Sequence, residues 1–146
     1  MKDVQTTLSV VPVLKEHLSL FWADASKVLE KSVATAKGKF KIKDILPRLT
    51  DGSMVLWVVI DPETTKVIAA ITTRVIEYPQ AKSLAMDWIG GTRMKDWLPM
   101  AQESISRYAK EHKCKYLEGY GRKGWDRWLR KYGWKLDYIA YKMELS

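Results

Sequence analysis

Cysteine and histidine are scarce in this sequence, with one cysteine and two histidines among 146 residues. A single thiol, Cys114, cannot form an internal disulfide, and the two histidines are too far apart in the sequence to suggest a shared site, so no metal site is implied. The longest apolar run, residues 54–60, is too short to cross a bilayer, and the N-terminal residues lack the apolar run of an export signal. We therefore expect a single cytoplasmic domain spanning residues 1–146, without membrane contact.

Acidic residues are also in the minority, because 25 lysines and arginines outnumber 17 aspartates and glutamates and give a formal net charge of +8. Residues 27–48 contain seven basic and two acidic side chains, and residues 110–135 contain nine and three. Such segregation favours an anionic partner, namely a nucleotide cofactor, a nucleic acid or an acidic protein surface. The alternative is a solvated basic face with no dedicated partner.

The spacing of apolar residues divides the chain into ten expected elements. Their order is strand, helix, helix, strand, strand, strand, helix, strand, helix, strand, over residues 7–11, 14–33, 42–49, 54–60, 67–76, 83–89, 94–112, 114–120, 124–132 and 134–145. Ser9 and Pro12 are expected to open the first helix, and Pro99 requires the third helix either to start near Met94 or to be kinked. This order predicts an α+β domain with a central mixed sheet of about six strands flanked by helices.

The element order and the chain length resemble the GNAT superfamily of acyl-CoA-dependent N-acetyltransferases. The best-matched stretches are the hairpin over residues 56–70 and the basic, tryptophan-rich segment over residues 121–134. The second stretch also looks like the tails of GNAT-like accessory proteins of tailed phages. The resemblance implies a GNAT-like fold over nearly the whole chain, acetyl-CoA as cofactor and an amine as acceptor. For a phage-encoded protein, the implied location is the host cytoplasm or the virion.

In that family, backbone N–H groups hold the cofactor's pyrophosphate at the turn between a central strand and the long helix that follows it. In this sequence these two elements are the expected strand over residues 83–89 and the expected helix over residues 94–112. A helix N-terminus offers unpaired donors and a positive dipole end to an anion. The matching segment contains the candidate cofactor-binding residues Gly90, Gly91, Thr92, Arg93, Met94 and Lys95. Its spacing is not the family's full Arg/Gln-x-x-Gly-x-Gly/Ala pattern, so the alternative is a Gly-Gly turn that only connects strand and helix.

The resemblance also implies a tyrosine four residues before the closing Gly133, where it protonates the departing thiolate. Leu129 occupies this position and cannot donate a proton, so the role is empty unless a neighbouring tyrosine fills it, the candidates being Tyr132, Tyr120 and Tyr138. Arg122 and Trp125 stand where the family has asparagine and alanine. The large Trp125 side chain is expected to intrude on the cofactor groove.

A general base for the amine is expected on the central strands, where Asp87 and Glu77 are the available carboxylates. Asp87 interrupts an apolar strand just before the expected phosphate turn, and a half-buried carboxylate there can have the raised pKa that a base needs. The alternative for Asp87 is a structural ion pair with a nearby lysine or arginine. Glu77 is more readily explained as loop surface.

Aromatic and basic residues alternate in the last expected helix, which is typical of protein interfaces and of stacking sites for single-stranded nucleic acid. The candidate partner-binding residues are Arg122, Trp125, Arg127, Trp128, Arg130 and Lys131. One of the two tryptophans is expected to pack inside and the other to make contacts.

Two hypotheses of different class follow from these features. The first is an acyl-CoA-binding N-acetyltransferase-type protein with a degenerate active site. The second is a non-catalytic scaffold, such as a phage virion or assembly protein, that docks on an acidic protein surface through its basic aromatic C-terminal region. Nucleic-acid binding is a third, weaker possibility, because no recognised motif accompanies the two basic blocks.

Overall fold

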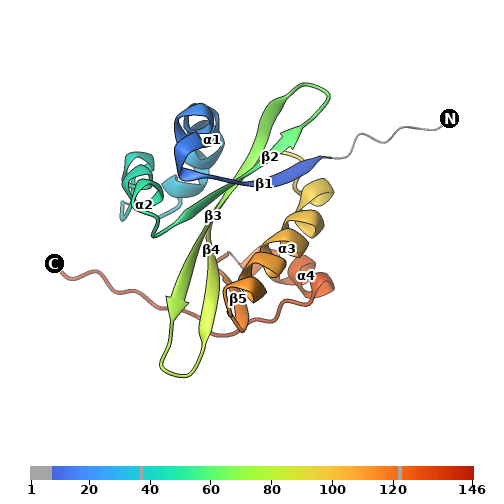
Figure 1. Ribbon diagram of the computed structural model, residues 1–146. Coiled ribbons are helices and arrows are strands. Elements are labelled where there is room, and N and C mark those ends of the chain that lie inside the picture. Colours follow the sequence, from blue (N-terminus) through green and yellow to red (C-terminus); the bar gives the residue numbers. More distant parts are fainter. Residues whose placement is uncertain (1–7, 37, 122) are drawn as a thin grey trace.

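The computed structural model describes residues 8–36, 38–121 and 123–146, which form a five-stranded mixed sheet with helices on both faces (Figure 1). The strands are β1 (Ser9–Val13), β2 (Val55–Asp61), β3 (Lys66–Glu77), β4 (Lys82–Gly91) and β5 (Tyr116–Gly119). The α-helices are α1 (Leu18–Ala34), α2 (Leu46–Thr50), α3 (Met94–Glu111) and α4 (Asp126–Leu129). Short 3-10 turns cover Lys15–His17, Ile42–Asp44, Lys123–Trp125 and Arg130–Tyr132.

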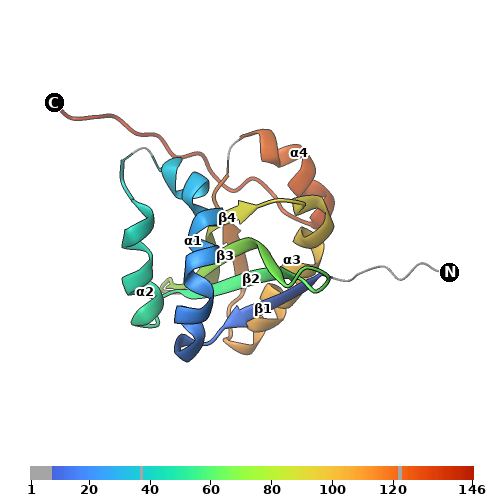
Figure 2. The same ribbon diagram turned by 90° about the horizontal axis from the view of Figure 1, so that it is seen from above.

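The strands lie in the order β1-β2-β3-β4-β5, and the first four are antiparallel neighbours. β5 is parallel to β4, because α3 crosses over between them. α1 and α2 cover one face of the sheet, while α3 and α4 lie on the other (Figures 1 and 2). The predicted α+β architecture with a mixed central sheet is confirmed, with five strands where about six were expected.

The missing strand is the last one, because residues 134–145 are irregular. Apolar and polar side chains alternate over residues 134–138 and again over residues 141–145, as they do in a strand. A strand nevertheless forms only where a neighbour accepts its backbone hydrogen bonds. The first helix was also placed too early. β1 runs through Pro12, which an edge strand tolerates, and the helical turns begin only at Lys15, so Ser9 does not cap them.

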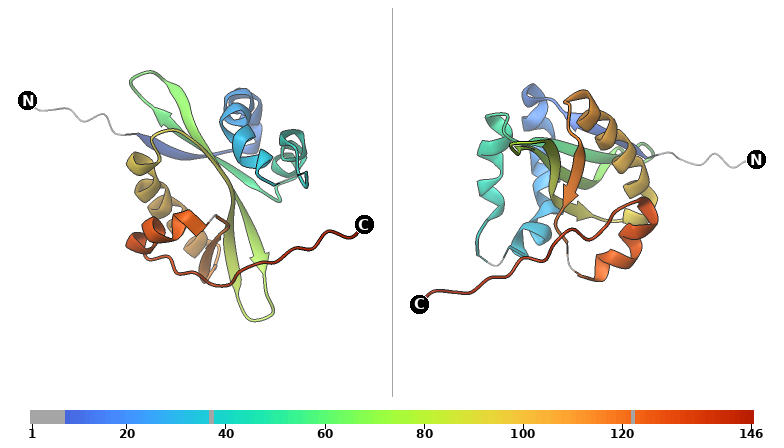
Figure 3. Two further views of the ribbon diagram at one scale, coloured as in Figure 1. Left: turned by 180° about the vertical axis from the view of Figure 1, so that it is seen from behind. Right: turned by 90° about the horizontal axis from the view of Figure 1, so that it is seen from below.

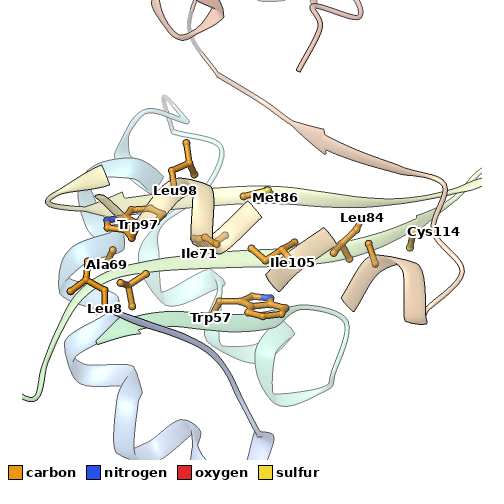
Figure 4. Close-up of a cluster of buried hydrophobic side chains, with 13 residues drawn as sticks. Leu8, Trp57, Ala69, Ile71, Leu84, Met86, Trp97, Leu98, Ile105 and Cys114 are labelled. Atoms are coloured by element: carbon orange, nitrogen blue, oxygen red, sulfur yellow. The ribbon is translucent and has the colours of Figure 1, made fainter. Parts of the chain in front are cut away.

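Two apolar clusters hold the layers together, one on each face of the sheet. On the α3 face, Trp97 and Ile105 pack against Trp57 and Ile71 (Figure 4). The Trp57 indole N–H donates to Thr73 Oγ1 at 2.9 Å, which satisfies a buried donor. On the other face, the buried residues of α1 and α2 pack against the sheet; they are Leu18, Ala25, Leu29, Val33 and Leu49.

α3 begins at Met94, as the sequence predicted, and continues through Pro99 to Glu111. Its buried residues share one face, since they recur every three to four positions: Trp97, Leu98, Ala101, Ile105 and Ala109. None of the described helices is long and apolar enough to span a membrane.

Candidate functional site at the start of helix α3

The sheet opens where β4 and β5 separate. β5 pairs with β4 only between Ser83 and Met86, and β4 then continues to Gly91 paired only with β3 on its other side. A β-bulge coincides with this point, because Thr72 pairs with Trp88 while Thr73 pairs with Met86. Asp87 is therefore the extra residue of the bulge. Bulges bend a strand away from its neighbour and re-aim a side chain.

Gly90 and Gly91 hold the end of β4 close to its neighbours. A Cβ on Gly90 would lie 2.1 Å from the carbonyl oxygen of Val28 in α1. A Cβ on Gly91, whose φ is +129°, would lie 2.5 Å from Cα of Ala69 in β3. Close backbone packing therefore explains why glycine is needed at both positions, without any role in cofactor binding. A phosphate site at this turn would have to be formed by the residues that follow Gly91.

Arg93 shapes the turn into α3 but is not a free cation. It adopts a left-handed conformation with φ +58°, and its guanidinium contacts Asp96 at 3.0 Å and Asp61 at 3.3 Å. The backbone of Thr92 is also engaged, because its N–H donates to Ile68 O and its carbonyl accepts the Trp97 indole N–H at 2.7 Å. These bonds fix the start of the helix against the β2–β3 hairpin.

The first N–H groups of α3 remain available. The helix has no side-chain cap, and among the described residues no bond is found for the N–H groups of Met94 and Lys95. The Lys95 side chain is exposed on the same turn. An uncapped N-terminus of an 18-residue helix with a lysine beside it attracts an anion.

This helix start borders a surface hollow of about 540 Å³ lined by Met94, Lys95, Gly124, Trp125 and Trp128. Figure 2 shows why these segments meet, since α4 lies beside the end of β4 and the beginning of α3. The ring centroids of Trp125 and Trp128 are 5.7 Å apart. The hollow thus unites two residues predicted to bind a cofactor with two predicted to bind a partner, which the sequence analysis had assigned to separate roles.

The remaining residues of the basic segment differ in their surroundings. Trp128 is half-buried against the α3-side core and meets the ring of Tyr132 edge-on, with centroids 5.6 Å apart. Arg127 and Lys131 are exposed, and Arg130 pairs with Asp126 at 2.9 Å. The expected partner-binding residue Arg122 lies outside the described residues.

Asp87 forms an ion pair with Arg74 of β3. The guanidinium donates to both carboxylate oxygens, at 2.8 and 3.0 Å, and the Asp87 side chain is only 12% exposed. The hydrogen bond to Asp87 raises the pKa of Arg74 above its ordinary value. The geometry therefore fits the structural alternative for Asp87. Glu77 is exposed and lies 3.7 Å from Lys82, also as a surface pair.

A carboxylate beside the opening, Glu118 of β5, was not predicted from the sequence. Tyr78 donates to it at 2.7 Å and Tyr120 at 3.2 Å. Burial tends to raise the pKa of Glu118, but the hydroxyl hydrogen bonds and the charge of Arg74 outweigh it and lower that pKa. Glu118 is therefore an anion at neutral pH. The available signal was a lone acidic residue within the short expected strand over residues 114–120.

The contacts of the candidate acid Tyr132 are with α3 and α4. Its carbonyl accepts a hydrogen bond from Gln102 at 2.8 Å, and its ring contacts Trp128. Within the described part of the chain, no hydrogen bond or ion pair joins Tyr132 to Asp87 or Glu77. The three predicted catalytic side chains are thus not linked to one another directly.

The contact between Tyr78 and Glu118 predicts that the phenol of Tyr78 titrates at a higher pH than a free tyrosine. The hydrogen bond to the Glu118 carboxylate raises the pKa of Tyr78 to about 12. The neutral phenol therefore stabilises the fold below about pH 10, and this contribution is lost as the pH rises toward 12. In Glu118→Gln, the pKa of Tyr78 should fall toward 10, as followed by the NMR shift of its ring carbons. The control is Glu103→Gln on α3; an unchanged Tyr78 titration in Glu118→Gln would contradict the contact.

No group of three or more metal-ligating side chains is found in the ranges that the structure describes.

No protein-family model matches the sequence, and no curated protein matches it. Solved structures do match. A probable acetyltransferase superposes with a TM-score of 0.73 at 13% identity, covering 94% of this chain and 98% of the other. Glucosamine-6-phosphate N-acetyltransferase from Arabidopsis thaliana gives 0.69 at 12% identity, covering 96% and 99%.

An aminoglycoside acetyltransferase from an uncultured soil metagenomic sample, in complex with trehalose, gives a TM-score of 0.71 at 13% identity and covers 99% of this chain and 100% of the other. Sequence identities this low support a shared architecture only. The reaction has to be inferred from the residues of the site. Other solved structures that match include a transcriptional regulator from Bacillus halodurans, with a TM-score of 0.66 at 13% identity, so the likeness shows a shared fold and no shared role. The chain has the GNAT-like fold that was predicted from the sequence.

Proposed function

We propose that this protein binds acyl-CoA at the start of α3 and is of N-acetyltransferase type. The observation that carries the proposal is the hollow at the uncapped start of an 18-residue helix, with Lys95 and two tryptophans in its lining. Donors, positive charge and flat apolar surface are the three features that a nucleotide diphosphate requires.

The residues present fit such a ligand. The N–H groups of Met94 and Lys95 would donate to a phosphate oxygen, and the Lys95 ammonium would balance its charge. The rings of Trp125 and Trp128 offer aromatic surface for a base. Trp125 lines the hollow together with Trp128, so the large residue expected to intrude on the groove becomes part of its wall.

The acceptor side is proposed to be the opening between β4 and β5. When bound, acyl-CoA supplies an activated thioester carbonyl, which an amine can attack. Asp87 and Glu118 are the carboxylates beside the opening, and both are engaged, Asp87 by Arg74 and Glu118 by two tyrosine hydroxyls. Glu118 can hold an acceptor as its ammonium ion, because its hydrogen bonds keep the carboxylate ionised. The ammonium has to lose a proton to solvent before the neutral amine attacks the thioester. Glu77, at the end of β3, is a weaker candidate for the general base.

A non-catalytic scaffold is the second candidate, and specific observations favour it. Leu129 cannot supply the proton that the GNAT-like resemblance assigns to its position, and the ion pair with Arg74 occupies both oxygens of Asp87. The exposed Arg127 and Lys131 would then serve an acidic protein surface, for example in a phage virion or assembly complex. In this role the protein would retain the GNAT-like fold but would not catalyse acetyl transfer.

Two measurements test the proposal and separate the candidates. Isothermal titration of acetyl-CoA and of CoA should show saturable binding in the micromolar range. Thiol release from acetyl-CoA, followed with a panel of amines, then reports on transfer. Binding with turnover supports the transferase, whereas binding without turnover for any amine supports a scaffold that retains the cofactor site. Absence of binding at millimolar ligand would overturn the proposal.

A further inference from the structure

Polar side chains gather on one face of the sheet beside the β3–β4 hairpin. Leu84 and Leu117 belong to the apolar cluster on the α3 face, so Ser83 and Glu118, each next to one of them along a strand, point to the opposite face. Figures 1 and 3 show that β3 and β4 extend beyond α1 and α2 at this end, where β5 pairs with β4. This end of the sheet is therefore left open by both helices.

Glu118 is the charged centre of this group. Tyr78 donates to its Oε2 at 2.7 Å and Tyr120 donates to its Oε1 at 3.2 Å. Each carboxylate oxygen has two lone pairs, so both oxygens can accept another hydrogen bond. Burial opposes ionisation, but the hydrogen bonds and the charge of Arg74 keep the pKa of Glu118 below its ordinary value. Glu118 is thus a half-buried anion with acceptor capacity to spare.

The charged side chains around Glu118 are already paired with one another. Arg74 donates to both oxygens of Asp87, and the Lys82 ammonium lies 3.7 Å from the Glu77 carboxylate. Among the described residues, no cation lies within ion-pair distance of Glu118. Charges that are partly removed from water are normally paired, so this carboxylate lacks the partner that its surroundings favour.

A second polar group beside Glu118 also lacks a partner. Ser83 is fully buried, and its hydroxyl forms no hydrogen bond of good geometry within the part of the chain that the structure describes. The hydroxyl is nevertheless close enough to Glu118 to contribute to lowering the pKa of that carboxylate. Buried hydroxyls nearly always have partners. An unsatisfied hydroxyl next to an unpaired carboxylate is therefore typical of a binding site and not of a packed core.

Tyrosine rings lie next to this carboxylate and are open to solvent. Tyr78, Tyr116 and Tyr120 are 45%, 54% and 53% exposed. One of these rings already holds a cation, because the Lys115 ammonium lies 5.7 Å from the ring centroid of Tyr116. The face of an aromatic ring attracts a cation, and an adjacent carboxylate adds a full negative charge. This combination favours an organic cation as the ligand.

We propose that Glu118 and the rings of Tyr78 and Tyr120 bind an alkylammonium group. Its N–H groups can donate to the free lone pairs of Glu118, and its apolar stem can lie on the tyrosine rings. A sugar amine fits less well, because its hydroxyls need several polar partners and Arg74 and Asp87 are occupied by each other. The inference deepens the proposed function, in which this cation would be the acceptor, but the binding itself requires no acyl-CoA.

Titration of n-butylammonium into the protein without CoA tests the site, with the ring-carbon NMR shifts of Tyr78 and Tyr120 as the readout. The shifts should saturate, and n-butanol, a neutral molecule of similar shape, should bind at least about tenfold more weakly. Glu118→Gln should lower the affinity for n-butylammonium by at least about tenfold, whereas the control Glu103→Gln on α3 should leave it within about twofold. Tyr120→Leu should weaken binding more than Tyr120→Phe, which keeps the ring.

Spermidine and Nα-acetyl-lysine amide separate two sources of this chemistry, a free polyamine and a lysine side chain. The source that binds more tightly is the one that the site serves, and equal affinities assign the site to the shared ammonium group. Equal binding of n-butanol, an unchanged affinity in Glu118→Gln, or no saturation by any of the amines at millimolar concentration would overturn the proposal. CoA binding without ammonium binding overturns this inference alone, and ammonium binding without CoA binding overturns only the proposed function.

Discussion

Gly90→Ala should lower the free energy of unfolding by about 3 kcal/mol, the upper end of the usual range for overpacking a well-packed core. The added Cβ would lie 2.1 Å from the carbonyl oxygen of Val28. This neighbour is backbone inside α1, so relief requires the helix to move away from β4. Urea unfolding followed by circular dichroism measures the change as a lower midpoint.

Gly124→Ala is the matched control, because nothing lies within 4 Å of a Cβ built on Gly124. Its stability should change by less than about 1 kcal/mol, and the sign should favour the alanine, which has fewer unfolded conformations. Equal effects at the two positions would contradict the close packing of β4 on α1.

Lys95→Glu should weaken CoA binding by at least about tenfold, which corresponds to about 1.4 kcal/mol. The substitution places a negative charge beside the two available N–H groups of α3, where an anionic ligand is expected. Isothermal titration measures the change in Kd. Because a surface charge is involved, the loss should shrink as salt is added.

Lys110→Glu provides the control for that change. It makes the same charge reversal in the last turn of the same helix, far from the hollow. CoA affinity should stay within about twofold, although the helix loses a favourable charge at its C-terminus. If the two variants bind CoA equally well, the ligand does not sit at the start of α3.

Much of the fold was predictable because its signals are local. The continuous apolar run of β2 predicts a strand buried on both faces, and the four-residue spacing of Trp97, Ala101, Ile105 and Ala109 predicts the buried face of α3. The aromatic residues Trp134, Tyr138 and Tyr141 are an equally local signal, and they gave a wrong strand over residues 134–145. Strand formation depends on a partner, and residues 134–145 pair with none of the described strands.

The site was predictable only in part, because its members come from distant parts of the chain. Lys95 and Trp125 were recognised separately, but a sequence does not show that they line one hollow. Gly90 and Gly91 suggested a phosphate turn, although their neighbours Val28 and Ala69 account for them by packing. Glu118 was missed, because its importance comes from tyrosine hydroxyls on either side of it in space.

The most direct test of the proposed site is a titration of CoA followed by backbone and indole NMR shifts. The largest changes should occur at the N–H groups of Met94 and Lys95 and at the indole N–H groups of Trp125 and Trp128, which line the hollow. Saturable changes confined to these groups would support acyl-CoA binding at the start of α3. Changes centred on the second hollow, between α1 and α2 around Trp22, or none at millimolar CoA, would contradict it.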